Sequence, residues 1–352
     1  MKSTCLRFAA VLLATAGLCF ADASSAIVRS EFIFTQAPYP SCHASTIAEV
    51  SPGHLVAAWF GGTRERAPDV CIWVARNVDG RWLPQEKAAD GVQPDGTRYP
   101  TWNPVLFQAP HGGPLFLFYK VGPKPAAWWG MVKTSTDGGI TWSAARRLPD
   151  GILGPIKNKP VILADGSWLS PSSREGGPKG WRVHFERSTD GGKTWVATAN
   201  VPKGPNFDAI QPSILFFKDG RLEALCRTRQ GVVAMTWSKD QGHTWSPLSA
   251  TILPNPNSGT DAVTLEDGRQ LIVYNDTAQR PESPGKGNRW PLDVAISTAG
   301  VNWKHVLTLE SKPMPAGYAY PAVIQTSDGL VRITYTWDRK RIKYVVLDPS
   351  RL

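Results

Sequence analysis

The sequence predicts an all-β fold in which six four-stranded sheets form a ring, a six-bladed β-propeller. Two sets of repeats interleave along the 352 residues, and the composition is rich in turn formers and large aromatics, with 32 Gly, 30 Pro and 15 Trp. Repeats of fixed period that consist only of strands and turns are typical of propellers. A long β-sandwich or a β-helix is the alternative, but β-helix repeats are usually shorter than the ones found here.

The first repeat is a turn that begins with serine and closes with tryptophan. Its aspartate can accept hydrogen bonds from nearby backbone N–H groups, and its glycine tolerates positive φ. The closing tryptophan offers a large apolar surface to bury between packed sheets. The turn occurs at residues 135–142, 188–195 and 238–245, in a shortened form at 297–303 and more weakly at 76–82.

The second repeat is a hairpin made of an apolar strand, a turn ending in glycine and another apolar strand. Six such hairpins recur about every 55 residues, and six hairpins predict six blades. No helix of more than two turns is expected. The turn glycines are Gly53, Gly113, Gly166, Gly220, Gly268 and Gly329.

Residues 1–23 are expected to be a secretory signal peptide. Lys2 and Arg7 precede an apolar run at 8–18 that is too short to span a bilayer, and residues 21–23 fit a small-x-small cleavage site. Residues 24–352 are then expected to form a single propeller domain that is exported, either to the periplasm or to the medium, with no membrane span after cleavage. An uncleaved anchor is the alternative.

The net charge and the absence of several known sequence motifs limit the kinds of partner and cofactor that we expect. A net charge of +10 favours an anionic partner, but the basic residues are scattered, so no nucleic acid is expected to bind. The sequence contains no zinc, calcium or phosphate-loop pattern and no serine-hydrolase elbow. We therefore expect neither a metal nor a cofactor.

The tryptophan-closed turn, Ser-x-Asp-x-Gly-x-Thr-Trp, resembles the Asp-box (BNR repeat) of sialidases, also called neuraminidases. With its six hairpins, the whole of residues 24–352 resembles their six-bladed propeller family. The Asp-box marks an outer turn of a blade, remote from the active face, and by itself implies no activity. The family resemblance implies an exo-α-sialidase-like glycoside hydrolase that acts on a terminal acidic sugar of a glycan.

Candidate site residues lie where the innermost strands begin, because in a propeller these strands all start at one face. Polar residues at these starts include Asn103, Asn158 and Gln211, which we expect to orient ligand hydroxyl groups. Trp128 and Trp129 could stack on a sugar face or pack within a blade.

Sialidases hold the substrate carboxylate with three arginines, attack with a tyrosine activated by a glutamate, and use an aspartate as acid and base. The resemblance assigns Arg227 and Arg289 to the second and third arginines and Tyr320 to the nucleophile. Glu65 or Asp69, in the loop after the first hairpin, would be the acid and base.

Two positions depart from the family pattern. His43 stands at the strand that carries the first arginine, and Gln211 stands where the partner glutamate is expected. Glutamine cannot accept the phenolic proton as a carboxylate can. The departures leave open two alternatives to hydrolysis: a uronate-specific polysaccharide lyase in which His43 and Tyr320 exchange protons, and a non-catalytic glycan-binding propeller.

Overall fold

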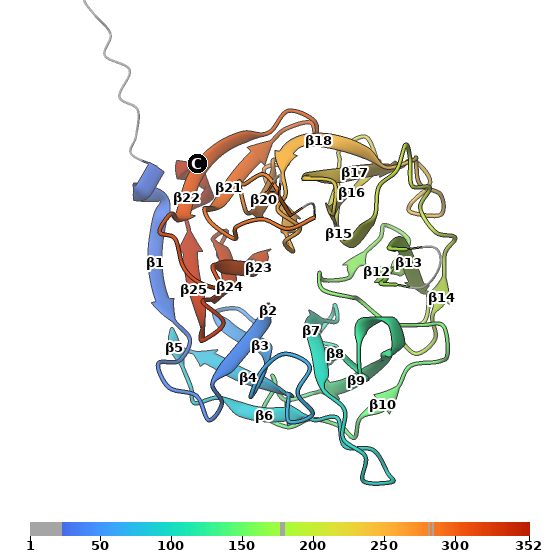
Figure 1. Ribbon diagram of the computed structural model, residues 1–352, viewed down its shortest axis with the longest axis vertical. Coiled ribbons are helices and arrows are strands. Elements are labelled where there is room, and N and C mark those ends of the chain that lie inside the picture. The colour runs from blue at the N-terminus through green and yellow to red at the C-terminus, as the bar shows by residue number, and fades with distance from the viewer. Residues whose placement is uncertain (1–22, 177–179, 281, 284) are drawn as a thin grey trace, which may run out of the picture.

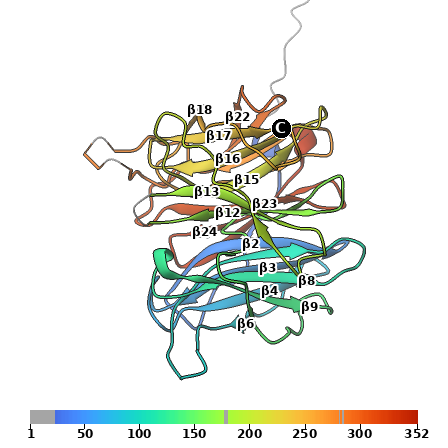
Figure 2. The ribbon, with the colours of Figure 1, turned by 90° about the vertical axis from the view of Figure 1, so that its right-hand side faces the viewer.

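Six antiparallel sheets surround a central channel, and they confirm the all-β, six-bladed propeller (Figure 1). The computed structural model describes residues 23–176, 180–280, 282–283 and 285–352. Except for Ala23, the predicted signal peptide lies outside these residues. Seen edge-on, the strands run roughly along the axis of the ring (Figure 2). None of the described helices has the length and apolar character needed to cross a membrane.

Each blade takes its strands in order from the channel outward. Blade 1 contains β2 (Ser41–Ser51), β3 (His54–Gly62), β4 (Cys71–Val78), β5 (Arg81–Trp82) and β6 (Glu86–Ala89). Blade 2 contains β7 (Thr101–Gln108), β8 (Leu115–Val121), β9 (Trp129–Ser135) and β10 (Arg146–Arg147). Blade 3 contains β11 (Val161–Ile162), β12 (Trp168–Arg174), β13 (Arg182–Ser188) and β14 (Val196–Ala197).

The second half of the ring repeats this order. Blade 4 contains β15 (Ala209–Phe216), β16 (Leu222–Thr228), β17 (Val232–Ser238) and β18 (Ser249–Pro254). Blade 5 contains β19 (Asp261–Thr264), β20 (Gln270–Tyr274), β21 (Leu292–Ser297) and β22 (Lys304–Glu310). Blade 6 contains β23 (Tyr318–Gln325), β24 (Val331–Trp337), β25 (Arg341–Leu347) and, as its outermost strand, β1 (Ile27–Phe32).

Helical structure in the described residues is limited to three short 3₁₀ segments. These are η1 (Ala23–Ala26), η2 (Pro125–Ala127) and η3 (Pro349–Arg351). The expectation that no helix exceeds two turns is therefore met within the described part of the chain. Of the three, η2 bears on the site, because it lies in the β8–β9 connection.

The six predicted turn glycines each lie between the first and second strands of a blade. Gly220, for example, joins β15 to β16 with a φ of +83° and with nothing near the position a Cβ would occupy. Its backbone conformation, rather than lack of space, is therefore what favours glycine there.

The Asp-box turns connect the third and fourth strands of blades 2 to 5, at the face opposite the strand starts that were expected to carry the site. In blade 3, Asp190 Oδ1 accepts a hydrogen bond from Thr194 N at 2.9 Å, and Ser188 Oγ accepts one from Gly192 N at 2.8 Å. Hydrogen bonds from Thr194 hold the pKa of Asp190 at about 2. The ionised carboxylate therefore stabilises the conformation of the turn.

The closing tryptophans fasten each blade to the one before it. Trp245 of blade 4 stacks on Phe185 of blade 3, with ring centroids 4.1 Å apart. Trp195 of blade 3 packs in one cluster with Phe116 and Phe118 of blade 2. Burial of such large side chains is worth about 2–3 kcal/mol each, so the repeat stabilises the ring as well as its turns.

Candidate active site

The innermost strands of four blades carry a β-bulge at the same place, next to the channel. The register shifts at the start of β2, β7, β15 and β23. The bulged residue is left-handed in each: Ala44 (φ 59°), Asn103 (φ 34°), Gln211 (φ 58°) and Tyr320 (φ 53°). The last three precede proline, which makes this conformation still less favourable. Each such residue costs about 1–3 kcal/mol, and strained residues of this kind cluster at functional sites.

The bulges surround a cavity of about 180 Å³, which we call the central pocket. Charged and aromatic side chains dominate its lining. It is lined by His43, Glu65, Arg66, Trp102, Asn103, Pro125, Trp128, Glu175, Arg227, Arg289, Tyr320 and Arg339.

The phenolic oxygen of Tyr320 lies between two nitrogen donors. Arg227 Nη1 donates a hydrogen bond to Tyr320 Oη at 2.7 Å, and Gln211 Nε2 donates one at 3.1 Å. Asn257 holds Arg227 in place, because its Oδ1 accepts a hydrogen bond from Arg227 Nε at 2.8 Å. Gln211, at the expected glutamate position, thus binds the tyrosine as a donor.

Two further arginines complete a cationic wall. The guanidinium of Arg289 lies 6.0 Å from the centre of the Tyr320 ring. Burial, together with the neighbouring charge of Arg227, lowers the pKa of Arg289. Arg339, in the turn between β24 and β25, has a φ of 57° and its Nη1 lies 2.6 Å from Glu65 Oε2. Arg66 also lines the pocket, and four guanidinium groups around one small pocket favour an anionic ligand.

His43 is buried beside Tyr320. The centres of the two rings are 4.2 Å apart, and His43 Nδ1 lies 3.0 Å from Thr336 Oγ1. Burial, followed by the charges of Arg339 and the other nearby cations, lowers the pKa of His43 well below its usual value of 6.5. At neutral pH the imidazole is therefore uncharged, with one N–H and one unprotonated ring nitrogen.

The predicted acid candidates separate in the structure. Glu65 lies in the central pocket, where it pairs with Arg339. Asp69 lies outside the lining of that pocket, and its Oδ2 accepts hydrogen bonds from Thr63 N at 2.9 Å and Thr63 Oγ1 at 2.7 Å. These bonds, against the opposing effect of burial, lower the pKa of Asp69.

The predicted amides also divide. Asn103 lines the central pocket and donates to Ile156 O at 3.2 Å. Asn158 lies outside the lining, and its Nδ2 donates to Gln211 O, Pro212 O and Ser213 Oγ at 3.0, 3.1 and 2.7 Å. The amide of Asn158 thus supports the bulge that carries Gln211 and does not face the pocket.

Four residues at or beside the pocket are absent from the predicted site: Glu175, Arg339, Lys157 and Arg66, of which Arg66 lines the pocket. Glu175 lines the pocket, and burial raises its pKa. Arg339 also lines the pocket, from the turn that follows β24. Lys157 lies under the ring of Tyr320, with its Nζ 5.8 Å from the ring centre, and burial lowers its pKa to about 7. Arg339 and Glu175 lie just after the second strands of their blades, β24 and β12, so the position at a strand end is the signal in the sequence that points to them.

A second hollow, which we call the side pocket, adjoins the central pocket. It has a volume of about 310 Å³ and shares Pro125, Trp128 and Glu175 with the central pocket. Arg174 lies on its wall. The two hollows could hold the two sides of a bond to be cleaved. Across the described residues, no three His, Cys, Asp or Glu side chains come together as a metal site.

Comparison with known proteins agrees with this architecture. Residues 53–333 match the family described as BNR repeat-like domain. The sequence is 27% identical to a sialidase of Micromonospora viridifaciens over 243 residues, which are 62% of this chain and 34% of that protein. The chain therefore spans about a third of the length of this curated relative.

Solved structures show the same fold. A Dyadobacter fermentans protein of unknown function superposes with a TM-score of 0.73 at 18% identity, over 92% of this chain and 98% of that one. A Hadza microbial sialidase superposes with a TM-score of 0.73 at 16% identity, over 89% of this chain and 67% of that one. Since the family match covers most of the sequence, the chain belongs to the sialidase-like family of BNR-repeat propellers.

Proposed function

We propose that the protein is an exported glycoside hydrolase that removes a terminal carboxylated sugar from a glycan. The observation that carries the proposal is that Arg227, Arg289 and Arg339 line the same pocket as Tyr320. Guanidinium groups bind carboxylates through paired hydrogen bonds. A small pocket of about 180 Å³ suits the end of a sugar chain better than its middle. The sialidase relatives support the same class of substrate.

Tyr320 is proposed to act at the anomeric carbon. Its oxygen forms a bond to that carbon while the bond to the leaving oxygen breaks, through a transition state with oxocarbenium character. Arg227 and Gln211 stabilise the phenolate by donating to Tyr320 Oη. The phenolic proton is proposed to pass to solvent as the carbon–oxygen bond to Tyr320 forms, with neutral His43 packed against the ring. A water molecule then attacks the anomeric carbon, the bond between that carbon and Tyr320 Oη breaks, the phenol regains a proton and the sugar is released.

Glu175 is proposed to protonate the leaving oxygen. Its raised pKa keeps the carboxyl protonated to higher pH than usual, as a general acid requires. Glu175 also lies on both the central and the side pocket, so the side pocket is placed to hold the departing glycan. Glu65 is the second carboxyl in reach, and its pairing with Arg339 gives it a role in holding that arginine.

A uronate-specific lyase is the second candidate, and the pair of His43 and Tyr320 favours it. In that reaction a base removes the proton next to the carboxylate, the leaving oxygen departs, and a double bond forms in the sugar. Neutral His43 suits the base, and the arginines would stabilise the charge that develops on the carboxylate.

One set of incubations separates these chemistries. The mature protein is mixed with sialosides and with uronate-containing polysaccharides, while reducing sugar and the absorbance of unsaturated uronate are followed. Release of the acidic sugar that disappears in Tyr320→Phe supports the hydrolase, whereas an unsaturated product supports the lyase. Neither product, with binding retained, would overturn both proposals and leave a glycan-binding propeller.

A further inference from the structure

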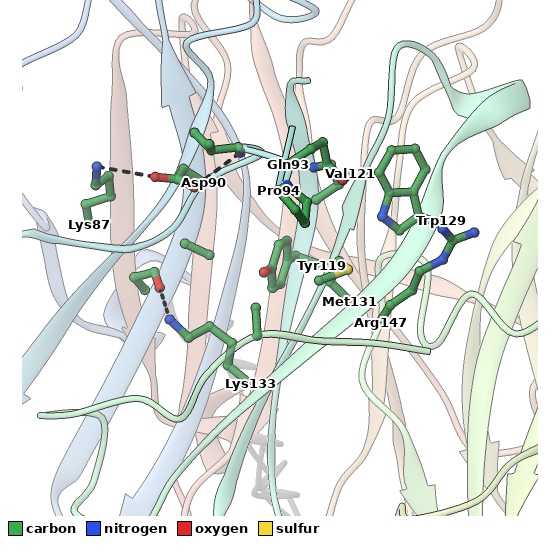
Figure 3. Close-up of a pocket in the computed structure, with 14 residues that line it drawn as sticks. Lys87, Asp90, Gln93, Pro94, Tyr119, Val121, Trp129, Met131, Lys133 and Arg147 are labelled. Carbon is green, nitrogen blue, oxygen red and sulfur yellow. Dashed lines mark hydrogen bonds and ion pairs between the residues drawn. The ribbon is translucent and has the colours of Figure 1, made fainter. Parts of the chain in front are cut away.

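A third cavity, which we call the rim pocket, lies between blades 1 and 2 at their outer strands. Its volume is about 590 Å³, compared with about 180 Å³ for the central pocket. One wall comes from β6 and the segment after it, and the other comes from β8, β9 and β10. Figure 3 shows Trp129 and Arg147 on one side, Lys87, Asp90 and Lys133 on the other, and Tyr119 with Met131 between them.

The lining of the rim pocket carries three cations and one carboxylate, and Arg147 also pairs with Asp150, just outside the lining, at 3.1 Å. Lys87 pairs with Asp90, whose carboxylate is the one acidic group of the lining, at 3.5 Å. Lys133 Nζ donates to the carbonyl of Ala88 at 2.7 Å, and an ammonium has two further donors. Burial lowers the pKa of Lys133, so an anion placed in the pocket would offset the cost of burying this cation.

Trp129 provides an aromatic surface in the same pocket. The ring is half-buried, with the guanidinium of Arg147 5.2 Å from its centre and Tyr99 packed edge-on at 5.6 Å. These contacts fix the orientation of the indole. A fixed aromatic side chain beside cations suits a sugar ring that carries a carboxylate, because the apolar face of the sugar packs on the ring.

The rim pocket is connected to the central pocket through one short segment. Trp128 lines the central pocket and packs against Trp102 at 5.8 Å, whereas its neighbour Trp129 lines the rim pocket. The two consecutive tryptophans therefore face different cavities. A glycan that crosses the connection between β8 and β9 would meet both.

We propose that the rim pocket is a second glycan-binding site, which holds a carboxylated sugar away from the reacting end of the substrate. The class of ligand rests on the proposed function, whereas the location rests on the rim pocket alone. In this arrangement Trp129 stacks on the sugar, and Lys133 and Arg147 bind its carboxylate. The site would raise affinity for long acidic chains without touching the bond that is cleaved.

Affinity electrophoresis tests the site, in gels that contain polygalacturonate, polysialic acid or neutral dextran. The Tyr320→Phe background is used so that turnover does not remove the polymer. We expect retardation by a carboxylated polymer but not by dextran, and about tenfold weaker binding in Arg147→Ala, as for the loss of one charged contact. The two acidic polymers distinguish a uronate from a sialic acid as the ligand.

Arg146→Ala is the matched control, because Arg146 is exposed on the same short strand but does not line the rim pocket. Equal binding by Arg147→Ala and Arg146→Ala, or no retardation of the parent protein in either acidic gel, would overturn the proposal. Turnover of a small substrate should be the same in both variants made without Tyr320→Phe. If no hydrolysis is detected but Arg147→Ala still weakens binding of the acidic polymer, the rim pocket is a glycan-binding site and the proposed hydrolase function is wrong.

Discussion

The two faces of the ring use their charged residues in opposite ways. On the Asp-box face, hydrogen bonds within each turn hold the pKa values of Asp137 and Asp190 at about 2, and the same arrangement recurs from blade to blade. On the pocket face, burial raises the pKa of Glu175 and lowers that of His43. Repeated residues thus build the scaffold, and residues that occur once in the ring build the site.

Backbone strain is distributed in the same way. On the Asp-box face, positive φ angles fall mostly on turn glycines such as Gly53 and Gly220, which have open space around them, and the exceptions Asp79, His111 and Gln241 also lie in turns. On the pocket face they fall on Asn103, Gln211 and Tyr320, whose side chains form the site. Because a non-glycine residue adopts this conformation at a cost of about 1–3 kcal/mol, the strained face is the one where function is expected.

The largest effect is expected at Tyr320. Tyr320→Phe should lower kcat by about 10³-fold, because the variant has no oxygen to act at the reacting carbon. Steady-state kinetics on the active substrate measures the loss. Asp190→Ala on the other face is the control and should leave kcat unchanged. A similar loss of kcat in both variants would contradict the assignment of catalysis to the pocket face alone.

Glu223 lies toward the Asp-box face but, unlike the aspartates of the Asp-box turns, has a raised pKa. It is fully buried, neither carboxyl oxygen has a hydrogen-bond partner among the described residues, and burial raises its pKa to about 8. Because the folded state holds this proton more tightly, stability is lost as pH rises from about 4.5 to 8.

Glu223→Gln should remove most of that dependence and stabilise the fold by roughly 3 kcal/mol at pH 8 relative to the parent protein. Urea unfolding at pH 5 and pH 8 measures the difference. Parallel losses in the two proteins would show that another group titrates in this range.

Arg227 tests the binding half of the pocket face. Arg227→Ala should weaken binding of the carboxylated sugar by about 100-fold, because it removes charge-assisted hydrogen bonds from a buried position. Arg221→Ala is the control, since Arg221 lies over Trp237 on the opposite face and should not affect binding. Calorimetric titration measures the affinity of both variants for the carboxylated sugar. Unchanged affinity in Arg227→Ala would contradict the proposal that Arg227 binds the carboxylate.

The smallest effect is expected at a single Asp-box. Asp190→Ala should lower Tm by about 2–4 °C at neutral pH. The depressed pKa of Asp190 means that its contribution is present above about pH 4 and is lost as pH falls through about 2. Melting curves of the variant and the parent protein should therefore converge in acid, and a constant difference would assign the effect to something other than this carboxylate.

Much of the fold followed from local patterns, because turns and alternating strands are encoded by neighbouring residues. The glycine hairpins and the Asp-box turns lie at the expected residues. The pocket was harder to predict. Arg339 reaches it only through a left-handed turn, and the burial of Glu175 depends on blades that are distant in sequence. Asp69 and Asn158 have the right chemistry, but their bonds to Thr63 and to the bulge at Gln211 hold them elsewhere.

The outermost strand of blade 6 has a consequence for how the molecule assembles. β1 pairs with β25, so residues near the start of the chain complete a sheet made by residues near its end. During synthesis β1 emerges first and has no partner strand until β25 has emerged. The ring is therefore closed by pairing between the two ends of the chain. Deleting residues 27–32 would remove this pairing, while the other five blades would keep all of their strands.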